Sequence, residues 1–216
     1  MFFLYQVILT IIILISPAII SFRILKNKEH RSRYKEKFGF YSKRRINGKL
    51  IWFHGASVGE ILSIIPLVKN YEKDKSINQI LITSNTLSSS KIIKKFKFKK
   101  TIHQFYPIDH IFITKKFLKY WKPNIAIYIE SEVWPSMFKE LDKKKIPLIL
   151  LNTRITKKSF NRWRIFPKFA NQIFSKISLA LPQNLETLKY LKLLKVKNIR
   201  IAGNLKYYGQ KITQDH

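Results

Sequence analysis

The fold is decided by the stretch Leu50-Ile51-Trp52-Phe53-His54-Gly55-Ala56-Ser57-Val58-Gly59-Glu60, in which an apolar run passes through a turn of small residues into a helix. The first five residues have the length and composition of a buried strand. The two glycines allow backbone and ligand to come close, because glycine has no side chain. The stretch therefore predicts a strand, a turn and a helix, with the carboxylate of Glu60 at the helix start.

A second stretch with carboxylates, Ile129-Glu130-Ser131-Glu132-Val133-Trp134-Pro135, closes a later apolar run in the same manner. Pro135 suits the first turn of a helix, and the four residues before it suit an entry loop. A carboxylate at the end of a half-buried strand needs a partner, because burying an unpaired charge is costly. The two stretches together predict one shared site.

Short apolar runs alternate with amphipathic stretches of helical length from residue 49 onward. The predicted strands cover 50–54, 79–83, 101–106, 125–130, 147–152, 177–182 and 198–202. The predicted helices cover 60–71, 88–97, 111–120, 135–144, 159–174 and 185–194. Strands that alternate with helices are typical of parallel sheets. We therefore expect an α/β fold, a single Rossmann-like parallel sheet with flanking helices.

Ligands of such sheets bind beyond the carboxyl ends of the strands, where loops lead into helices. The predicted elements place these polar residues at that edge: His54, Ser57, Glu60, Thr83, Ser84, Asn85, Asp109, Glu130, Glu132, Asn152 and Arg154. Glu60 suits either acid–base catalysis or a helix cap, since a helix start lowers a carboxyl pKa and burial raises it. For Glu130 the alternative to chemistry is a salt bridge with a neighbouring lysine.

The other acidic residues and the histidines carry weaker signals. Asp109 and Glu132 are expected to cap helices or loops, and eight acids lie in polar runs typical of a solvated surface: Glu29, Glu36, Glu72, Asp74, Glu140, Asp142, Glu186 and Asp215. The chain has no cysteine and its five histidines lack ligand spacing, so no transition-metal site is expected. Neither a Walker loop nor a Gly-x-Gly-x-x-Gly fingerprint is present.

Residues 2–22 form an almost unbroken apolar run, interrupted only by Gln6, Thr10, Ser16, Pro17 and Ser21. A helix of this length can cross a hydrocarbon core of about 30 Å. A cleaved signal peptide is the alternative, but no basic stretch precedes the run, and the run is longer than a signal core. Basic residues crowd the segment that follows, which marks the cytoplasmic side of a span. We expect one N-terminal transmembrane helix, with the folded part in the cytoplasm.

The chain carries 42 Lys and Arg against 12 Asp and Glu, a formal net charge of +30 over 216 residues. This excess predicts an anionic partner such as nucleic acid, acidic lipid or a phosphorylated substrate. A compositionally biased genome would give the same excess, so charge by itself leaves the partner open. A nucleic-acid-binding module would carry a helix-turn-helix, zinc or aromatic RNA-binding pattern, and none occurs, so no nucleic acid partner is expected.

Five motifs occur in order along the chain: Lys37-Phe38-Gly39, the stretch 54–60, the stretch 130–135, Leu151-Asn152-Thr153-Arg154-Ile155 and Gly203-Asn204-Leu205-Lys206. With them the chain closely resembles the N-terminal half of 3-deoxy-D-manno-octulosonic acid (Kdo) transferase, over nearly its whole length. The resemblance implies the N-terminal domain of a glycosyltransferase-B fold, which takes the lipid A precursor as acceptor. It also implies CMP-Kdo as donor, bound by a C-terminal domain, and no metal or other cofactor.

The resemblance also implies roles for single residues. Glu60 matches the general base, and Glu130 and Lys206 match residues assigned to transition-state stabilisation. The expected substrate contacts are Ser57, Gly59 and Arg154. Arg154, at a strand end, suits a direct contact to a phosphate or carboxylate group.

The expected organisation has four parts: a membrane anchor at 1–23, a basic juxtamembrane segment at 24–48, a Rossmann-like acceptor-binding domain at 49–207, and the start of an interdomain linker at 208–216, with the donor-binding domain absent. On this resemblance the chain is a truncated or split half of an enzyme that transfers Kdo to lipid IVA in lipopolysaccharide biosynthesis, at the anionic inner membrane. The alternative is a catalytically inactive, membrane-anchored, lipid-binding remnant.

Overall fold

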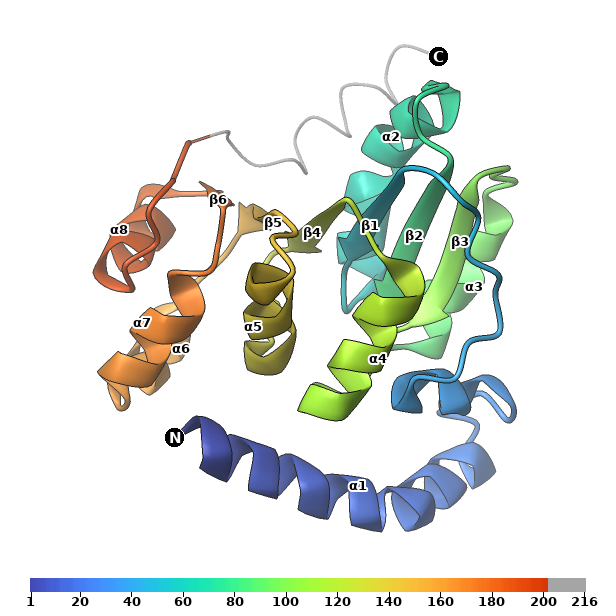
Figure 1. Ribbon diagram of the computed structural model, residues 1–216, viewed down its shortest axis with the longest axis horizontal. Helices are drawn as coiled ribbons and strands as arrows, with labels where there is room; N and C mark the ends of the chain where they lie inside the picture. The colour runs from blue at the N-terminus through green and yellow to red at the C-terminus, as the bar shows by residue number, and fades with distance from the viewer. Residues whose placement is uncertain (202–216) are drawn as a thin grey trace.

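The computed structural model describes residues 1–201 and has a six-stranded parallel sheet at its centre (Figure 1). The strands are β1 (Leu50–His54), β2 (Gln79–Ser84), β3 (Thr101–Phe105), β4 (Ile125–Ile129), β5 (Leu148–Thr153) and β6 (Leu179–Pro182). Their order in the sheet is β3-β2-β1-β4-β5-β6, which is the Rossmann order. The predicted α/β class is confirmed, and the strand order reverses between β1 and β4.

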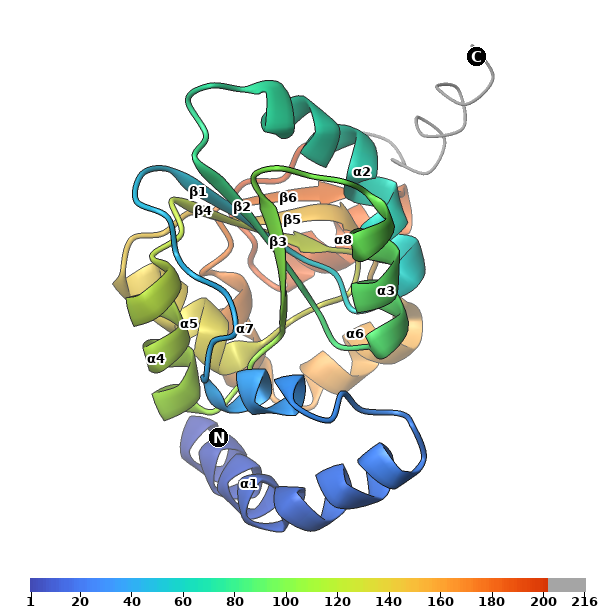
Figure 2. The same ribbon diagram turned by 90° about the vertical axis from the view of Figure 1, so that its right-hand side faces the viewer.

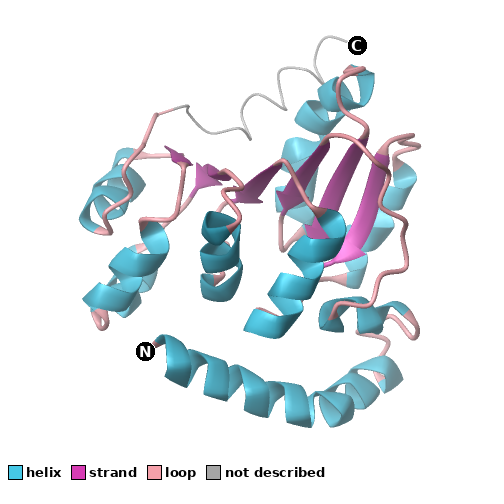
Figure 3. Cartoon of the chain, viewed as in Figure 1, coloured by secondary structure: helices cyan, strands magenta, loops and turns pink. Residues whose placement is uncertain are grey.

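Helices cover both faces of the sheet (Figures 2 and 3). They are α1 (Phe2–Leu25), α2 (Val58–Lys73), α3 (Leu87–Lys95), α4 (Ile111–Trp121), α5 (Pro135–Lys143), α6 (Lys157–Arg164), α7 (Pro167–Phe174) and α8 (Leu185–Leu193), with a short 3₁₀ helix, η1 (Arg33–Phe38). Helices α2 and α3 pack on one face, and α4, α5 and α7 pack on the other. Helix α1 lies outside this second layer.

The strands are buried on both faces, which explains why they read as continuous apolar runs in the sequence. In β1, Trp52 joins a core rich in aromatic side chains from α4 and α5. Ile51 and Phe53 point the other way, into a second core built mainly of isoleucine under α2 and α3. Full burial of a side chain such as Phe53 contributes about 1.5–3 kcal/mol. The sheet is therefore a rigid support for the loops at its edges.

Two predicted elements differ from the structure. The single helix predicted at 159–174 is two helices, α6 and α7, because Pro167 cannot donate a backbone hydrogen bond and instead opens a new first turn. The strand predicted at 198–202 is reduced, within the described residues, to one parallel bridge between Ala180 and Ile199. The remaining predicted strands and helices are confirmed, with ends that shift by no more than two residues.

Three of the acids predicted to lie on a solvated surface are buried instead: Glu29, Glu36 and Glu140. Glu36 pairs with Arg33 at 2.7 Å and accepts a hydrogen bond from the backbone N–H of Phe105 at 2.8 Å. These contacts hold η1 against β3, an edge strand that would otherwise present an unpaired backbone donor. For Glu36 the prediction was wrong because the strand that covers it is distant in the sequence: Phe105 lies 69 positions further along the chain.

Helix α1 has 24 residues and a mean hydropathy of 2.4 in its most apolar window, so it is long and apolar enough to cross a membrane. Length and composition alone do not separate a span from a signal sequence, which would meet the same criteria. Only 11% of that window is buried by the rest of the protein. Most of the helix surface is therefore open to another environment.

Candidate functional site

The candidate site lies where the strand order reverses. Strands β1 and β4 are neighbours in the sheet, although β2 and β3 lie between them in the sequence. Glu60 follows β1 at the start of α2, and Glu130 follows β4 directly. The structure thus brings both predicted carboxylates to one edge of the sheet, at the position where ligands of open α/β sheets bind.

Glu60 is held in place by the turn that precedes it. One carboxylate oxygen, Oε2, accepts a hydrogen bond from the backbone N–H of Ala56 at 2.8 Å, and Oε1 accepts from Ser57 Oγ at 2.8 Å. Ser57 Oγ in turn accepts from the backbone N–H of Glu60 at 3.2 Å. This arrangement is a variant of the capping box, in which the Glu60 carboxylate reaches the backbone N–H of Ala56 rather than that of the N-cap residue Ser57, so Glu60 does cap α2. The cap also fixes the direction in which its carboxylate points.

The pKa of Glu60 is raised above its ordinary value, which answers the question that the sequence left open. Partial burial is the main cause, and the negative charges of Glu132 and Glu130 add to it. The hydrogen bonds from Ala56 and Ser57 stabilise the ionised form and oppose the rise. The three carboxylates are therefore close enough to influence one another, and Glu60 is a better proton acceptor than a solvated glutamate.

The two glycines of the turn play different parts. A Cβ on Gly55 would lie 3.1 Å from Glu60 Cβ and 3.2 Å from Ile61 Cδ1, so the helix start packs tightly against the strand end at this glycine. Gly59 lies on the exposed side of the first turn of α2, and a Cβ there would meet nothing nearer than Ser57 Oγ at 4.0 Å. Gly55 is therefore tightly packed, whereas Gly59 leaves room in front of the site.

Glu130 adopts a left-handed backbone conformation, with φ of +57°. This conformation costs a residue with a side chain about 1–2 kcal/mol, and such strain collects at functional sites. The backbone N–H of Glu130 donates to Leu151 O at 3.0 Å, which ties it to β5. Ser131 Oγ donates to the carbonyl of Arg154 at 2.7 Å, and the Arg154 side chain is exposed beside this edge.

A chain of hydrogen bonds runs under the site through His54, which is fully buried in β1. The arrangement that pairs every donor has Trp52 Nε1 donating to Thr83 Oγ1 at 2.9 Å and Thr83 Oγ1 donating to His54 Nδ1 at 3.0 Å. His54 Nε2 then donates to Glu132 Oε2 at 3.3 Å, and Trp134 Nε1 donates to the same oxygen at 2.9 Å. Burial lowers the pKa of His54, so its ring is neutral near pH 7. Glu132 is thus oriented by two donors beside Glu60.

Asp109, which follows β3, is 1% exposed and caps a helix distant in the sequence. Its oxygens accept from the backbone N–H groups of Ser136 and Met137, both at 2.8 Å, in the first turn of α5. Oδ2 also accepts from Tyr5 Oη at 2.7 Å. The prediction that Asp109 is a cap is confirmed, and its carboxylate belongs to the support of the fold.

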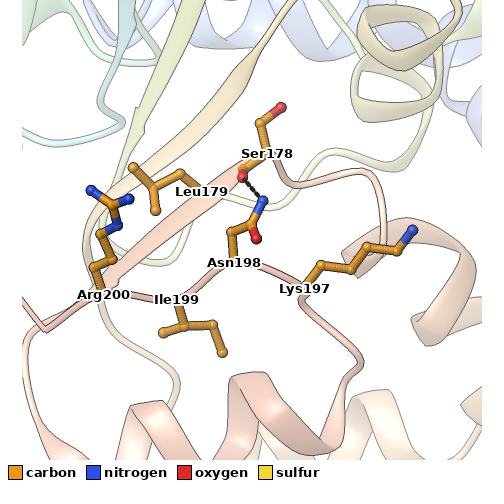
Figure 4. A pocket seen from close by; sticks show the side chains of 6 residues that line it. All are labelled: Ser178, Leu179, Lys197, Asn198, Ile199 and Arg200. Atoms are coloured by element: carbon orange, nitrogen blue, oxygen red, sulfur yellow. Dashed lines mark hydrogen bonds between the residues drawn. The ribbon is translucent and has the colours of Figure 1, made fainter.

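Some predicted or possible sites lie elsewhere. Lys206 lies outside the described residues, so its place stays a prediction. Within residues 1–201 no group of His, Asp and Glu side chains is suited to a metal ion. A cavity of about 460 Å³ opens beside the start of β6, where Asn198 Nδ2 donates to Ser178 O at 3.0 Å (Figure 4). It lies toward the amino end of β6, away from the carboxylates.

Comparison with known proteins adds the family. A family model described as 3-deoxy-D-manno-octulosonic-acid transferase (kdotransferase) matches residues 32–208. The chain belongs to the Kdo transferase family. A protein of Rickettsia bellii named 3-deoxy-D-manno-octulosonic acid transferase is 39% identical over 194 residues, which cover 90% of this chain and 46% of that protein. A probable mitochondrial transferase of the same name from Arabidopsis thaliana is 37% identical over 206 residues, 91% of this chain and 46% of its own length. The chain thus spans about half the length of these relatives.

Solved structures support the fold. UDP-GlcNAc 2-epimerase from Neisseria meningitidis bound to UDP-GlcNAc aligns with a TM-score of 0.53 at 14% identity, over 77% of this chain and 50% of that one. The S. aureus MnaA–UDP structure aligns with a TM-score of 0.55 at 15% identity, over 78% of this chain and 48% of that one. At such identities the likeness shows the fold alone. The chain therefore has a glycosyltransferase-B-like fold in the part described.

Sequence reasoning missed two features of this edge. The spacing Ser57-x-x-Glu60 is the capping-box pattern and could have predicted the reciprocal hydrogen bonds. The pairing of His54 with Glu132 left no signal in the sequence, because the two residues are 78 positions apart and meet only in the folded sheet.

Proposed function

We propose that the carboxyl edge at β1 and β4 is the acceptor site of a Kdo transferase and that Glu60 is its general base. The observation that carries the proposal is the meeting of Glu60 and Glu130 at the reversal of strand order, in a chain of the Kdo transferase family. Ligands of open parallel sheets bind at such a reversal.

In the proposed reaction Glu60 removes the proton from an acceptor hydroxyl as that oxygen attacks the anomeric carbon of Kdo. The bond between this carbon and the phosphate oxygen of CMP breaks, its electron pair leaves with CMP, and the configuration inverts. A raised pKa suits Glu60 to this task, because a stronger base takes a proton more readily. Glu130 and Lys206 are proposed to stabilise the transition state.

The proposed substrate contacts lie at the same edge of the sheet. Ser57 and Gly59 face solvent beside Glu60, where they leave space for a sugar ring. The Arg154 side chain is exposed next to the loop that carries Glu130 and suits a phosphate or carboxylate group. CMP-Kdo itself is proposed to bind to the C-terminal domain of the family, with residues 49–207 taking the acceptor.

A groove of about 370 Å³ supports a lipid as acceptor. It begins at Ser131, next to Glu130, and its wall contains Val133, Trp163, Phe166 and Phe169 together with Arg162. Phe169 in turn contacts Tyr5 of α1, with ring centroids 6.4 Å apart. An acyl chain suits the apolar wall, and a phosphate suits Arg162. The acceptor is therefore proposed to be the phosphorylated lipid A precursor, lipid IVA, at the cytoplasmic face of the inner membrane.

Reconstitution tests the proposal. Membranes that contain this chain are mixed with the separately produced C-terminal half of the Rickettsia bellii relative, CMP-Kdo and tetraacylated disaccharide bisphosphate. Kdo-lipid should form, and it should not form when either half is left out. No product from two folded halves, together with lipid binding that Glu60→Gln leaves unchanged, would contradict the proposal and favour a lipid-binding remnant.

A further inference from the structure

Helix α1 is joined to the α/β domain by three polar side chains near its start. Tyr5 Oη donates to Asp109 Oδ2 at 2.7 Å. Gln6 Nε2 donates to Ser136 Oγ at 2.8 Å, and Gln6 Oε1 accepts from the backbone N–H of Ile111 at 2.9 Å. Thr10 Oγ1 lies 3.3 Å from His110 Nε2. All four contacts reach the first turns of α4 and α5 or the loops that lead into them.

These contacts satisfy groups that need a partner. Asp109 is 1% exposed, and a buried carboxylate without enough donors would cost several kcal/mol. The backbone N–H of Ile111 opens α4 and has no partner inside its own helix, so the Gln6 side chain caps it. Helix α1 therefore completes the hydrogen bonding of the domain rather than merely lying near it.

The sequence of α1 divides into two faces. At 3.6 residues per turn, the interruptions of the apolar run, Gln6, Thr10, Ser16, Pro17 and Ser21, fall within about 140° of arc. The least exposed residues of the helix, among them Phe2, Tyr5, Ile13 and Ile20, fall on or next to this same side. The opposite side is exposed and wholly apolar, and consists of Leu4, Val7, Ile8, Ile11, Ile12, Leu14, Ile15, Ile19, Phe22 and Leu25.

A transmembrane path would break these contacts. The basic end of α1, at Arg23 and Lys26, would stay at the cytoplasmic surface, and Tyr5 would lie about 27 Å away along the helix axis, on the far side of the bilayer. From there neither Tyr5 nor Gln6 could reach the domain. The observed contacts and a single crossing therefore exclude each other.

We propose that α1 does not cross the membrane but lies in its interface, docked on α4 and α5 through Tyr5, Gln6 and Thr10, with its apolar outer face in the lipid. The views agree that α1 runs past α5 and α4 along one side of the molecule (Figures 1 and 2). The docking residues belong to the carboxyl edge of the sheet. The arrangement thus turns the candidate site toward the membrane surface, whatever the chemistry of Glu60.

Charge near both ends of α1 fits an anionic lipid surface. At the amino end Lys139 Nζ lies 3.9 Å from the centre of the Phe2 ring on the docked side, and Lys143 lines a cavity together with these two residues. At the other end Lys26 Nζ lies 4.3 Å from the Phe22 ring, and Lys28 is exposed beyond it. Each such cation contributes about 1 kcal/mol of attraction to an anionic leaflet. The apolar face and its basic ends match an interfacial helix that is buried by about 5–10 Å.

Cross-linking in native membranes tests the docking, and the chain has no cysteine to interfere. The pair Phe2→Cys and Lys139→Cys lies across the docked contact, and the pair Ile15→Cys and Lys139→Cys is the matched control. With a short bis-maleimide, the first pair should link within one chain at least about tenfold faster than the second, because its effective concentration is higher. Equal, slow rates for both pairs would overturn the proposal.

Three further measurements separate the alternatives. A cysteine inserted after Met1 should react with a membrane-impermeant maleimide in inside-out vesicles and be protected in right-side-out vesicles; the reverse result would show a crossing helix and overturn the proposal. Links between chains that carry Ile15→Cys alone would show a second copy on the outer face in place of lipid, which also overturns the proposal.

The double variant Tyr5→Phe with Gln6→Leu keeps the helix apolar and should slow the docked cross-link several-fold. An unchanged cross-linking rate would show that Tyr5 and Gln6 do not hold α1 on the domain, which overturns the docking as proposed. None of these results depends on Kdo transfer.

Discussion

Glu60 and Asp109 follow strands of the same sheet at the same edge, yet their surroundings differ. Burial raises the pKa of both carboxyl groups, that of Asp109 to about 6. Asp109 is enclosed, and three donors from α5 and Tyr5 point at its oxygens. Glu60 is partly exposed, is held by its own turn, and lies beside the like charges of Glu132 and Glu130.

The difference separates a structural acid from a candidate catalytic one. An enclosed carboxylate whose donors are matched has no free side on which a substrate could bind. A carboxylate that is oriented by a cap, open on one side and crowded by other negative charges can accept a proton from a bound hydroxyl. A raised pKa is common to both residues, so the pKa alone does not distinguish them; access does.

The largest expected effect is on activity at Glu60. Glu60→Gln should lower Kdo transfer in the reconstituted membranes by about 100- to 10,000-fold, the usual contribution of a general base. Its thermal stability should change by less than about 1 kcal/mol, because glutamine also serves in capping boxes. Glu186→Gln, at an exposed helix start, is the control and should keep full activity. Unfolding of the Glu60→Gln chain would make this residue structural, like Asp109.

Asp109 should show the reverse pattern. Asp109→Ala leaves the backbone N–H groups of Ser136 and Met137 buried without an acceptor, and each such donor costs about 1–3 kcal/mol. We expect a loss of about 2–5 kcal/mol in the free energy of unfolding, measured by denaturant titration in detergent. A variant as stable as the parent protein would show that the Asp109 carboxylate does not contribute to the free energy of unfolding.

The two glycines sharpen the comparison at the Glu60 turn. Gly55→Ala places a Cβ against Glu60 and should destabilise the protein by about 1–3 kcal/mol, as overpacking does. Gly59→Ala has room and should raise stability by up to about 1 kcal/mol, since alanine is the better helix former. If Gly59 faces the acceptor, as proposed, Gly59→Ala will nevertheless reduce transfer. Full activity in Gly59→Ala would show that Gly59 does not contact the acceptor.

The smallest expected effect is on the pH dependence. The negative charge of Glu132 raises the pKa of Glu60, so Glu132→Gln should lower that pKa. Because the base must be ionised, the acid side of the pH–rate profile should move to lower pH. Glu72→Gln, on the far end of α2, should leave the profile in place. A shift to higher pH in Glu132→Gln would contradict the proximity of the two carboxylates.

Local and topological features of the molecule could be predicted from sequence. Apolar runs located β1 to β6, and the rule that ligands bind at the carboxyl ends of parallel strands was enough to assign Glu60 and Glu130 to one edge. The break at Pro167 was missed because the amphipathic pattern continues through it, although proline in the middle of a helix is itself a warning.

Long-range contacts could not be predicted in the same way. Tyr5 donates to Asp109, 104 positions further along the chain. The sequence of an apolar run does not show which groups its few polar residues contact. The burial of Glu36 and the pairing of His54 with Glu132 depend likewise on which strands become neighbours. Sequence periodicity reports which side of an element is buried, and the partner on that side is fixed only when the whole sheet assembles.

The pH–rate profile of Kdo transfer, measured for the parent chain and for Glu60→Gln in the same reconstituted membranes, tests the central claim most directly. We predict an acid limb in the parent with a midpoint above the ordinary glutamate value of about 4.3, and residual activity in Glu60→Gln that no longer shows this limb. An acid limb that persists unchanged in Glu60→Gln would show that another group accepts the proton.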